Sequence, residues 1–140
     1  MNVTEADIRQ KVTQWLEYAD EDLRLARHAF ALATGTPYRL IAYHAQQCAE
    51  KHLKAFLVHN MIDFPYTHSI SHLLELCEAK ASWASDLETA EVLSTYATTA
   101  RYPGEAETVS EAEARRAVEL AEKVREVVRQ ALQIEDGAGT

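Results

Sequence analysis

Hydrophobic positions recur at intervals of three and four along most of the chain, which is the period of an amphipathic α-helix. The first such stretch runs from Ile8 to Phe30, and Thr4 followed by Asp7 resembles the capping pair that opens a helix. We therefore expect a long first helix over residues 5–33.

A tight connection follows, in which Gly35 lies past the end of the first helix. Thr36 is placed to cap the next helix, and Pro37 suits its first position. So short a connection predicts an antiparallel hairpin of two helices. The second helix should span residues 38–59.

The second predicted helix has two occupied faces. Its core face is apolar and consists of Ala42, Ala45, Ala49, Leu53 and Phe56. The opposite face has a line of His44, Cys48 and Lys51, flanked by Leu40 and Val58. Gln46, Glu50 and Lys54 are left as a solvated edge. Such a helix is central in a bundle or uses its second face for a ligand or partner.

Pro65 interrupts the pattern, and a short third helix is predicted to open at Thr67 or His68. A fourth helix should begin with a cap at Ser85 or Asp86 and end at Arg101, before Pro103. The apolar positions expected to face inward in these two helices are Ile70, Leu73, Leu74, Cys77, Leu87, Ala90, Leu93, Ala97 and Ala100.

The last helix is predicted from a capping box of Ser110 and Glu113 to about Glu135. No segment shows the alternation of a half-buried strand. The expected fold class is thus all-α, a five-helix up-and-down bundle of four longer helices and one short helix. It should form one domain over residues 1–135, with a frayed tail at residues 136–140.

Composition narrows the functional classes. The 140 residues suit a single domain, and the net charge of −8 argues against nucleic-acid binding over the whole surface, although one basic pocket stays compatible with it. Cys48 and Cys77 fall within helical patterns, so two packed thiols in a reducing cytoplasm are expected. No apolar run approaches the ~18 residues that span a membrane, so we expect a soluble protein.

Three segments resemble a known family when taken in order. They are Tyr43-His44-Ala45-Gln46-Gln47-Cys48-Ala49-Glu50-Lys51, then Thr67-His68-Ser69-Ile70 before Leu73-Leu74, then Tyr96 with Arg101-Tyr102-Pro103. Together they are similar to the HEPN family, the small helical domain of higher eukaryotes and prokaryotes that binds or acts near nucleotides. The resemblance covers nearly the whole chain.

This resemblance implies a homodimer, often encoded beside a minimal nucleotidyltransferase in toxin and antitoxin modules. Many relatives are metal-independent endoribonucleases, which carry an Arg at the position of Arg101 and then, after four to six intervening residues, a His. Here residues 106–108 are Ala, Glu and Thr, so that histidine is missing. The spacing does occur at Arg39 and His44, but with nine Arg and six His about one such match is expected by chance.

The candidate ligand-binding residues are His44, Gln47, Lys51, Tyr96, Arg101 and Tyr102. Imidazole, amide and ammonium groups one turn apart suit a phosphate or a nucleobase edge, but the same three side chains also suit a dimer contact. Arg101 suits a phosphate, and is the only catalytic candidate; alternatively it pairs with a carboxylate and fixes the end of its helix. Tyr102 either shapes the turn or lines the pocket.

A metal centre and a cofactor are not expected. His44, Cys48 and His52 recur every four residues, but they drift across the helix and leave no closed set of four ligands. His68 and His72 form an isolated pair, and His68 suits a capping or packing role.

Three functional interpretations follow. The first is a nucleotide- or RNA-binding and interaction module, dimeric and partnered by a minimal nucleotidyltransferase. The second is an endoribonuclease toxin that combines Arg101 with a histidine from elsewhere, such as His44 or His68. The third is an acidic helical scaffold without a ligand.

Overall fold

The computed structural model describes residues 3–97 and 108–133. Within these ranges the chain forms five helices and no strand, which confirms the predicted all-α bundle. The helices are α1 (Glu5–Ala29), α2 (Tyr38–His59), α3 (Ile70–Cys77), the 3₁₀-helix η1 (Ser82–Tyr96) and α4 (Glu111–Ala131). No helix in the described ranges is both long and apolar enough to cross a membrane.

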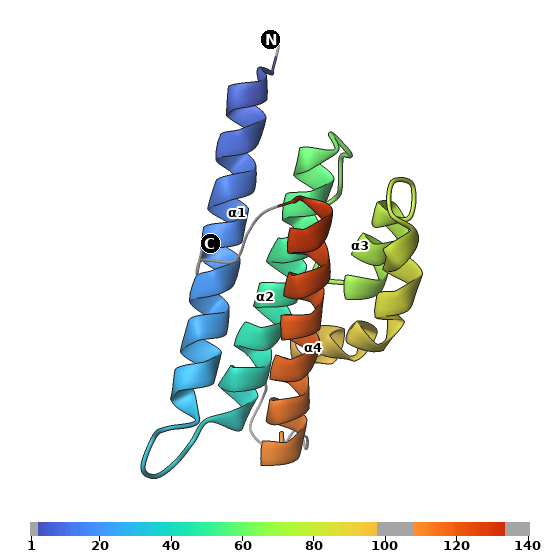
Figure 1. Ribbon diagram of the computed structural model, residues 1–140. Coiled ribbons are helices and arrows are strands. Elements are labelled where there is room, and N and C mark those ends of the chain that lie inside the picture. Colours follow the sequence, from blue (N-terminus) through green and yellow to red (C-terminus); the bar gives the residue numbers. More distant parts are fainter. Residues whose placement is uncertain (1–2, 98–107, 134–140) are drawn as a thin grey trace.

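Helix α2 is the centre of the molecule. It packs most extensively against α1 and next against α4, and it also contacts α3 and η1. Figure 1 shows that α1 and α2 are antiparallel and that α4 runs in the same direction as α2. Helices α3 and η1 lie on the side of α2 that faces away from α1. The prediction of a central helix is therefore confirmed.

The core face of α2 was also predicted correctly. Ala42, Ala45, Ala49 and Leu53 have no exposed surface, and Phe56 retains only 4%. Small alanines let the neighbouring helices approach α2 closely, while the buried leucines of α1, α3 and η1 fill the space between them. The neighbouring helices cover α2 on most sides, which is why few side chains of α2 reach water.

Helix α1 begins as predicted, with a capping box in which Thr4 and Asp7 bond to each other's backbone amides. Its predicted end at residue 33 is wrong, because the helix stops at Ala29. Leu32 is half exposed there, so no burial stabilises a further turn. Gly35 has a φ of +66° and lets the chain reverse toward α2. The residue before α2 is Pro37, and no side chain caps it.

The starts of α3 and η1 differ from the predictions. Ser69, rather than Thr67 or His68, caps α3 by accepting from the amide of His72. The predicted cap at Ser85 or Asp86 is wrong as well, because η1 already begins at Ser82.

The conformation of η1 follows from its spacing of buried residues. The positions at three-residue intervals are buried, namely Ala81, Ala84, Leu87, Ala90 and Leu93. A period of three matches a 3₁₀-helix rather than an α-helix. At Leu87 the backbone leaves helical geometry (φ −104°, ψ 15°), so η1 consists of two stretches joined by a kink.

Helix α4 opens with the predicted capping box of Ser110 and Glu113. It ends at Ala131, four residues before the predicted end at Glu135, and Gln133 then adopts a φ of +57°. The tail at residues 136–140 lies outside the described residues, as does the predicted end of the fourth helix at Arg101.

Candidate functional site

Three of the predicted site residues share one partly exposed face of α2, where it meets α1. The carboxylate of Asp22 on α1 lies 2.8 Å from His44 Nδ1 and accepts a hydrogen bond of 2.6 Å from Lys51 Nζ. Gln47 follows the same face between His44 and Lys51, but it is buried, with 8% of its surface exposed, and its amide donates to Gln46. We call Asp22, His44 and Lys51 the Asp22 cluster.

The Asp22 cluster fixes how the imidazole is oriented. An ionised carboxylate only accepts hydrogen bonds, so Nδ1 of His44 carries the proton and points at Asp22. The side chains retain between 12% and 25% of their exposure, so solvent and ligands reach them. His44 therefore presents Nε2, which has no hydrogen-bond partner among the described residues, from a fixed position.

A second cluster corrects the prediction that Gln46, Glu50 and Lys54 form a solvated edge. All three are buried, with exposures of 5% or less. Glu50 accepts from Gln46 and Lys54 at 2.9 Å and lies 2.8 Å from His68 Nδ1. Burial by itself would raise the pKa of Glu50, but these hydrogen bonds hold it below its ordinary value. We call Gln46, Glu50, Lys54 and His68 the Glu50 cluster.

The Glu50 cluster joins two of the segments that carry the family resemblance. Gln46 and Glu50 come from the first segment, while His68 comes from the second and also accepts from Gln46 through its backbone carbonyl. Aromatic rings of Trp15, Phe64 and Tyr66 surround the ammonium of Lys54 at 5.5 to 5.9 Å. The contacts of His68 and Lys54 thus fasten the segment after α2 to the helix.

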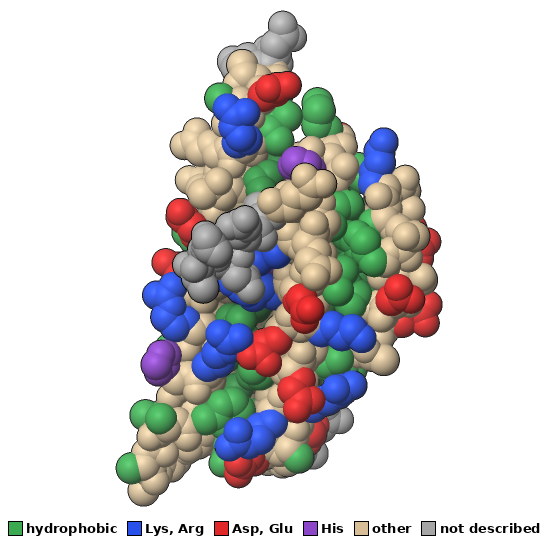
Figure 2. Space-filling model, in the orientation of Figure 1, with side chains coloured by type: hydrophobic (Ala, Val, Ile, Leu, Met, Phe, Trp, Pro, Cys, Tyr) green, Lys and Arg blue, Asp and Glu red, His purple; other side chains and the backbone are tan. Residues whose placement is uncertain are grey.

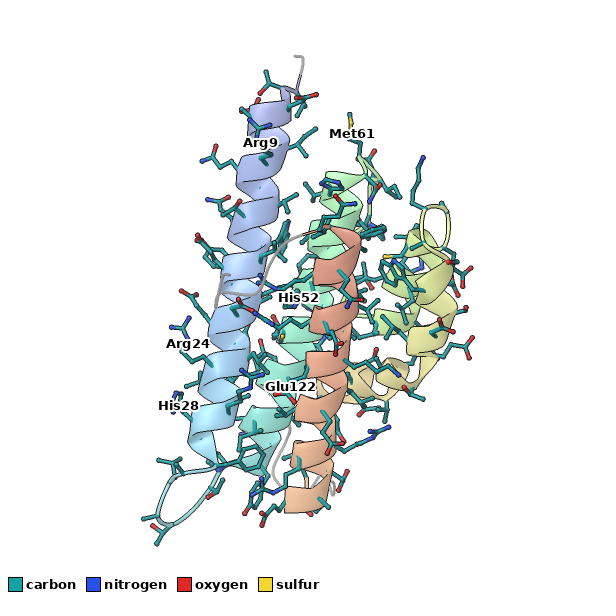
Figure 3. The ribbon with its side chains drawn as sticks, viewed as in Figure 1. Arg9, Arg24, His28, His52, Met61 and Glu122 are labelled. Carbon is teal, nitrogen blue, oxygen red and sulfur yellow. The ribbon has the colours of Figure 1, made fainter. Side chains whose placement is uncertain are left out.

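A third cluster lies between α1, α2 and α4, where Figure 3 places His52 in the middle of the molecule. Asp20 accepts from Arg125 at 2.9 Å and from Arg129 at 2.7 Å. Arg129 also donates to His52 Nε2 at 3.3 Å, and the other ring nitrogen of His52 bonds to the carbonyl of Cys48. We call Asp20, His52, Arg125 and Arg129 the Asp20 cluster.

The Asp20 cluster contains no group poised for chemistry. Burial, assisted by the charge of Arg129, lowers the pKa of His52 to about 4 despite its bond to the Cys48 carbonyl. Burial also raises the pKa of Cys48, so both groups are neutral near pH 7. Because His52 faces a guanidinium, it cannot join His44 and Cys48 around a cation. Within the described ranges no three His, Cys, Asp or Glu residues are grouped as metal ligands.

The remaining predicted residues lie elsewhere. Tyr96 is at the end of η1, where its hydroxyl donates to Glu113 of α4 at 3.4 Å. It lines a hollow of about 330 Å³ together with Arg116 and Leu120. Arg101 and Tyr102 lie outside the described residues, so their roles stay predictions.

The face shown in Figure 2 carries interspersed acidic and basic side chains over α4 and the end of α1, without a patch of one sign. Its ion pairs include Arg27 with Glu122 and Arg116 with Glu119. Exposed pairs of this kind contribute little to stability and leave no concentrated charge for a ligand. The seam between α1 and α2 therefore holds the better candidate site.

Sequence reasoning missed Asp22, the residue that organises this seam. Asp20, Glu21 and Asp22 follow one another in an acidic helix, and nothing in their order marks one of them. Its partners His44 and Lys51 lie 22 and 29 positions further along the chain. The only available signal was that Asp22 stands seven residues after Trp15, on a face of α1 next to the core stripe.

Comparisons with known proteins agree with the fold. The HEPN domain model matches residues 12–131. The crystal structure of ST0689, an archaeal HEPN homologue, is similar with 29% identity and a TM-score of 0.67, covering 86% of this chain and 96% of that chain. The crystal structure of TT1696 from Thermus thermophilus is similar with 28% identity and a TM-score of 0.68, covering 86% of this chain and 97% of that chain. No curated protein matches the chain.

Proposed function

The chain belongs to the HEPN domain family, and on that premise we propose that it is a cytoplasmic binding and interaction module for a nucleotide or an RNA end. The ligand binds along the α1–α2 seam at the Asp22 cluster and Gln47. The module acts as a homodimer and engages a minimal nucleotidyltransferase, the kind of partner that the family resemblance implies.

The observation that supports this proposal is the meeting of His44 and Lys51 at Asp22, with Gln47 between them along α2. The ammonium of Lys51 and the amide of Gln47 donate hydrogen bonds, and the carboxylate of Asp22 accepts them. Nε2 of His44 has no hydrogen-bond partner among the described residues. Donors and acceptors side by side match the edge of a nucleobase, which itself carries both. Since Asp22 already balances Lys51, the seam suits a base edge better than an isolated phosphate. Arg101 is the expected phosphate ligand.

Thermal unfolding in the presence of nucleotides and short RNA tests the binding half. A ligand that binds only the native state increases the free energy of unfolding, by about 2.7 kcal/mol when its concentration is one hundred times its Kd. The midpoint temperature of unfolding rises accordingly. Lys51→Gln should remove the shift, whereas Lys123→Gln, an exposed lysine on α4, should retain it. No shift with any nucleotide or RNA at millimolar concentration would reject binding and favour the scaffold interpretation.

Co-purification tests the interaction half. The chain is expressed together with the product of its neighbouring gene, and only one of the two carries an affinity tag. A stable complex of the two proteins is expected. Failure to recover any complex, with both proteins soluble, would reject the partnership while leaving the nucleotide result intact.

A second candidate function is supported by the pairing of His44 with Asp22. A histidine held by a carboxylate can act as a general base, taking the proton of an RNA 2′-OH while the 2′-oxygen attacks phosphorus. The P–O5′ bond breaks, the 5′-oxygen takes a proton from water and a 2′,3′-cyclic phosphate forms, with Arg101 stabilising the negative charge. RNA should then be cleaved without metal, and His44→Ala or Arg101→Ala should abolish cleavage. Cleavage unchanged by both substitutions would reject this function.

A further inference from the structure

A small cleft opens on α1 next to the Asp22 cluster. It has a volume of about 190 Å³ and is lined by Lys11, Gln14, Trp15 and Tyr18. All four side chains come from two turns of one helix, so the cleft does not depend on how a loop folds. Its volume suits one planar ring system and is far too small for a nucleic-acid duplex.

Trp15 forms a fixed wall of this cleft. Its indole meets Phe64 edge to face, with centroids 6.5 Å apart, and the ammonium of Lys54 lies 5.5 Å from its centre. Lys54 is itself held by the buried Glu50. The indole is therefore oriented before any ligand arrives, which lowers the entropic cost of binding.

Tyr18 stands one turn further along α1 and forms the other aromatic lining residue. Half of its surface is exposed, so one side of the ring is accessible to a ligand. No described side chain bonds to its hydroxyl. An exposed aromatic beside an ordered one is the arrangement on which nucleic-acid bases stack.

Charge favours the same ligand. The chain as a whole has a net charge of −8, and Lys51 and Lys54 beside this seam are already paired with Asp22 and Glu50, which leaves Lys11. Lys11 is exposed at the cleft itself. An ammonium next to a stacking surface suits the phosphate of a nucleotide.

The cleft lies on the same face of α1 as Asp22. Lys11, Trp15, Tyr18 and Asp22 follow one another at intervals of four, three and four, so they line one face of α1. Tyr18 thus lies between the cleft and the Asp22 cluster. A single strand would cover both features without leaving the seam between α1 and α2.

We propose that this seam binds single-stranded RNA, with one base stacked between Trp15 and Tyr18 and its phosphate at Lys11, while the neighbouring nucleotide occupies the Asp22 cluster. The inference rests on the proposed function, because it extends the same site by one nucleotide. It assigns base stacking to Trp15 and Tyr18, and phosphate binding to Lys11.

Fluorescence anisotropy with a labelled single-stranded RNA of eight nucleotides tests the assignment at low salt. Tyr18→Ala should weaken binding about tenfold, since the loss of one base–aromatic stack has roughly this effect. Tyr18→Phe should bind as the wild type does, because it keeps the ring. Leu25→Ala is the matched control, as Leu25 is equally exposed on α1 but outside the cleft, and it should leave affinity unchanged.

Two further readouts address Lys11 and Trp15. Lys11→Gln should reduce the slope of log affinity against log salt by about 0.7, the value for one phosphate contact of a single strand. Trp83→Phe leaves Trp15 as the only tryptophan, and its emission should be quenched on addition of unlabelled RNA. Quenching would place the base at the indole directly.

Each result separates the inference from the proposed function. RNA binding with unchanged affinity in Tyr18→Ala would overturn the stacking site and leave the proposed function standing. Binding of AMP without binding of the oligonucleotide would overturn the assignment to a strand. If neither AMP nor the oligonucleotide binds to the wild-type protein, both the inference and the proposed function are rejected.

Discussion

Two aspartates, two positions apart on α1, organise two different regions of the molecule. Asp20 receives guanidinium groups from α4, and its cluster includes a histidine with no exposed surface. Asp22 receives an imidazole and an ammonium from α2, and about a fifth to a quarter of those two side chains is exposed. Both carboxylates have two partners and are partly exposed, with 30% of the Asp20 side chain and 12% of the Asp22 side chain accessible. What sets the first region apart is that His52 and Arg129 are buried.

The difference lies in the number of helices that close each cluster. The Asp20 cluster joins α1, α2 and α4, and every polar atom that it buries has a partner. The Asp22 cluster joins only α1 and α2 and is open on its outer side. Buried members such as His52 and Arg129 depend on each other for their hydrogen bonds, whereas His44 and Lys51 keep contact with solvent. Stability and binding should therefore respond to different substitutions.

The largest effect is expected when the Asp20 cluster loses Arg129. Arg129→Ala leaves His52 Nε2 buried without a donor and removes one of the two guanidinium partners of Asp20. Breaking a buried ionic network costs about 3 kcal/mol in unfolding free energy. Urea denaturation measures it from the shift in midpoint at constant slope. A loss below about 1 kcal/mol would show that this cluster does not stabilise the fold.

The pH dependence of stability should report the same cluster. The pKa of His52 is about 4 in the folded protein and ~6.5 when unfolded, so the unfolded chain binds the proton first. The contribution of neutral His52 to the free energy of unfolding is fully present above pH ~6.5. It falls as the pH is lowered, by about 2 kcal/mol between pH 7 and 4.5. His52→Gln should flatten this profile. Parallel profiles for the two proteins would contradict the buried neutral state of His52.

That pH window has to stop at about 4.5, because carboxylates titrate below it. Asp20 and Glu50 have lowered pKa values in the folded protein, owing to hydrogen bonds from their partners that outweigh burial. A lowered carboxyl pKa gives stability that is lost as the pH falls through it, which is the same sign as for His52. Between pH 7 and 4.5, the difference between the wild-type and His52→Gln profiles isolates His52 from the other five histidines.

A smaller effect on stability, together with a large effect on binding, is expected for the Asp22 cluster. Lys51→Ala removes an ion pair whose side chains are 21% and 12% exposed, but unlike Arg129→Ala it leaves no fully buried histidine without a donor, so the unfolding free energy should fall by only about 1–2 kcal/mol. RNA affinity should nevertheless fall, and fluorescence anisotropy measures it. If Lys51→Ala lowered the free energy of unfolding as much as Arg129→Ala does, the Asp20 and Asp22 clusters would not differ in their contribution to stability.

The smallest effect serves as the control for Arg129. Arg116 also lies on α4 and pairs with Glu119, but more than half of each side chain is exposed. Arg116→Ala should change the unfolding free energy by less than about 0.5 kcal/mol. A larger loss would mean that removing any arginine from α4 destabilises the helix, irrespective of the Asp20 cluster.

The core could be predicted from the sequence because burial of apolar residues repeats with the helix. Ala42, Ala45 and Leu53 are assigned by period alone. The 3₁₀ conformation of η1 was missed, although its buried residues recur strictly every three positions, a spacing that the sequence displays. Helix ends were less predictable, since α1 stops where Leu32 finds nothing to pack against.

The polar residues of α2 could be predicted only in part. Gln46, Glu50 and Lys54 follow one another at intervals of four, a spacing shared by solvated faces and by buried hydrogen-bonded runs. Which of the two occurs depends on Trp15 and the residues after α2. The period did bring His44, Gln47 and Lys51 to one face.

The clusters on α1 had no local signal at all. Asp20 meets Arg129, which is 109 positions away along the chain, and a single sequence does not reveal contacts at that separation. For the same reason the partner of His44 could not be named in advance. Spacing identifies which side chains share a helix face, whereas packing decides which of them are joined.

The most direct test of the binding claim is an NMR titration of the isotopically labelled protein with the eight-nucleotide single-stranded RNA. Amide and side-chain signals of Asp22, His44, Gln47 and Lys51 should shift with increasing RNA. Signals of Asp20, His52 and Arg129 should stay in place. Shifts confined to the Asp20 cluster, or to residues outside the α1–α2 seam, would contradict it.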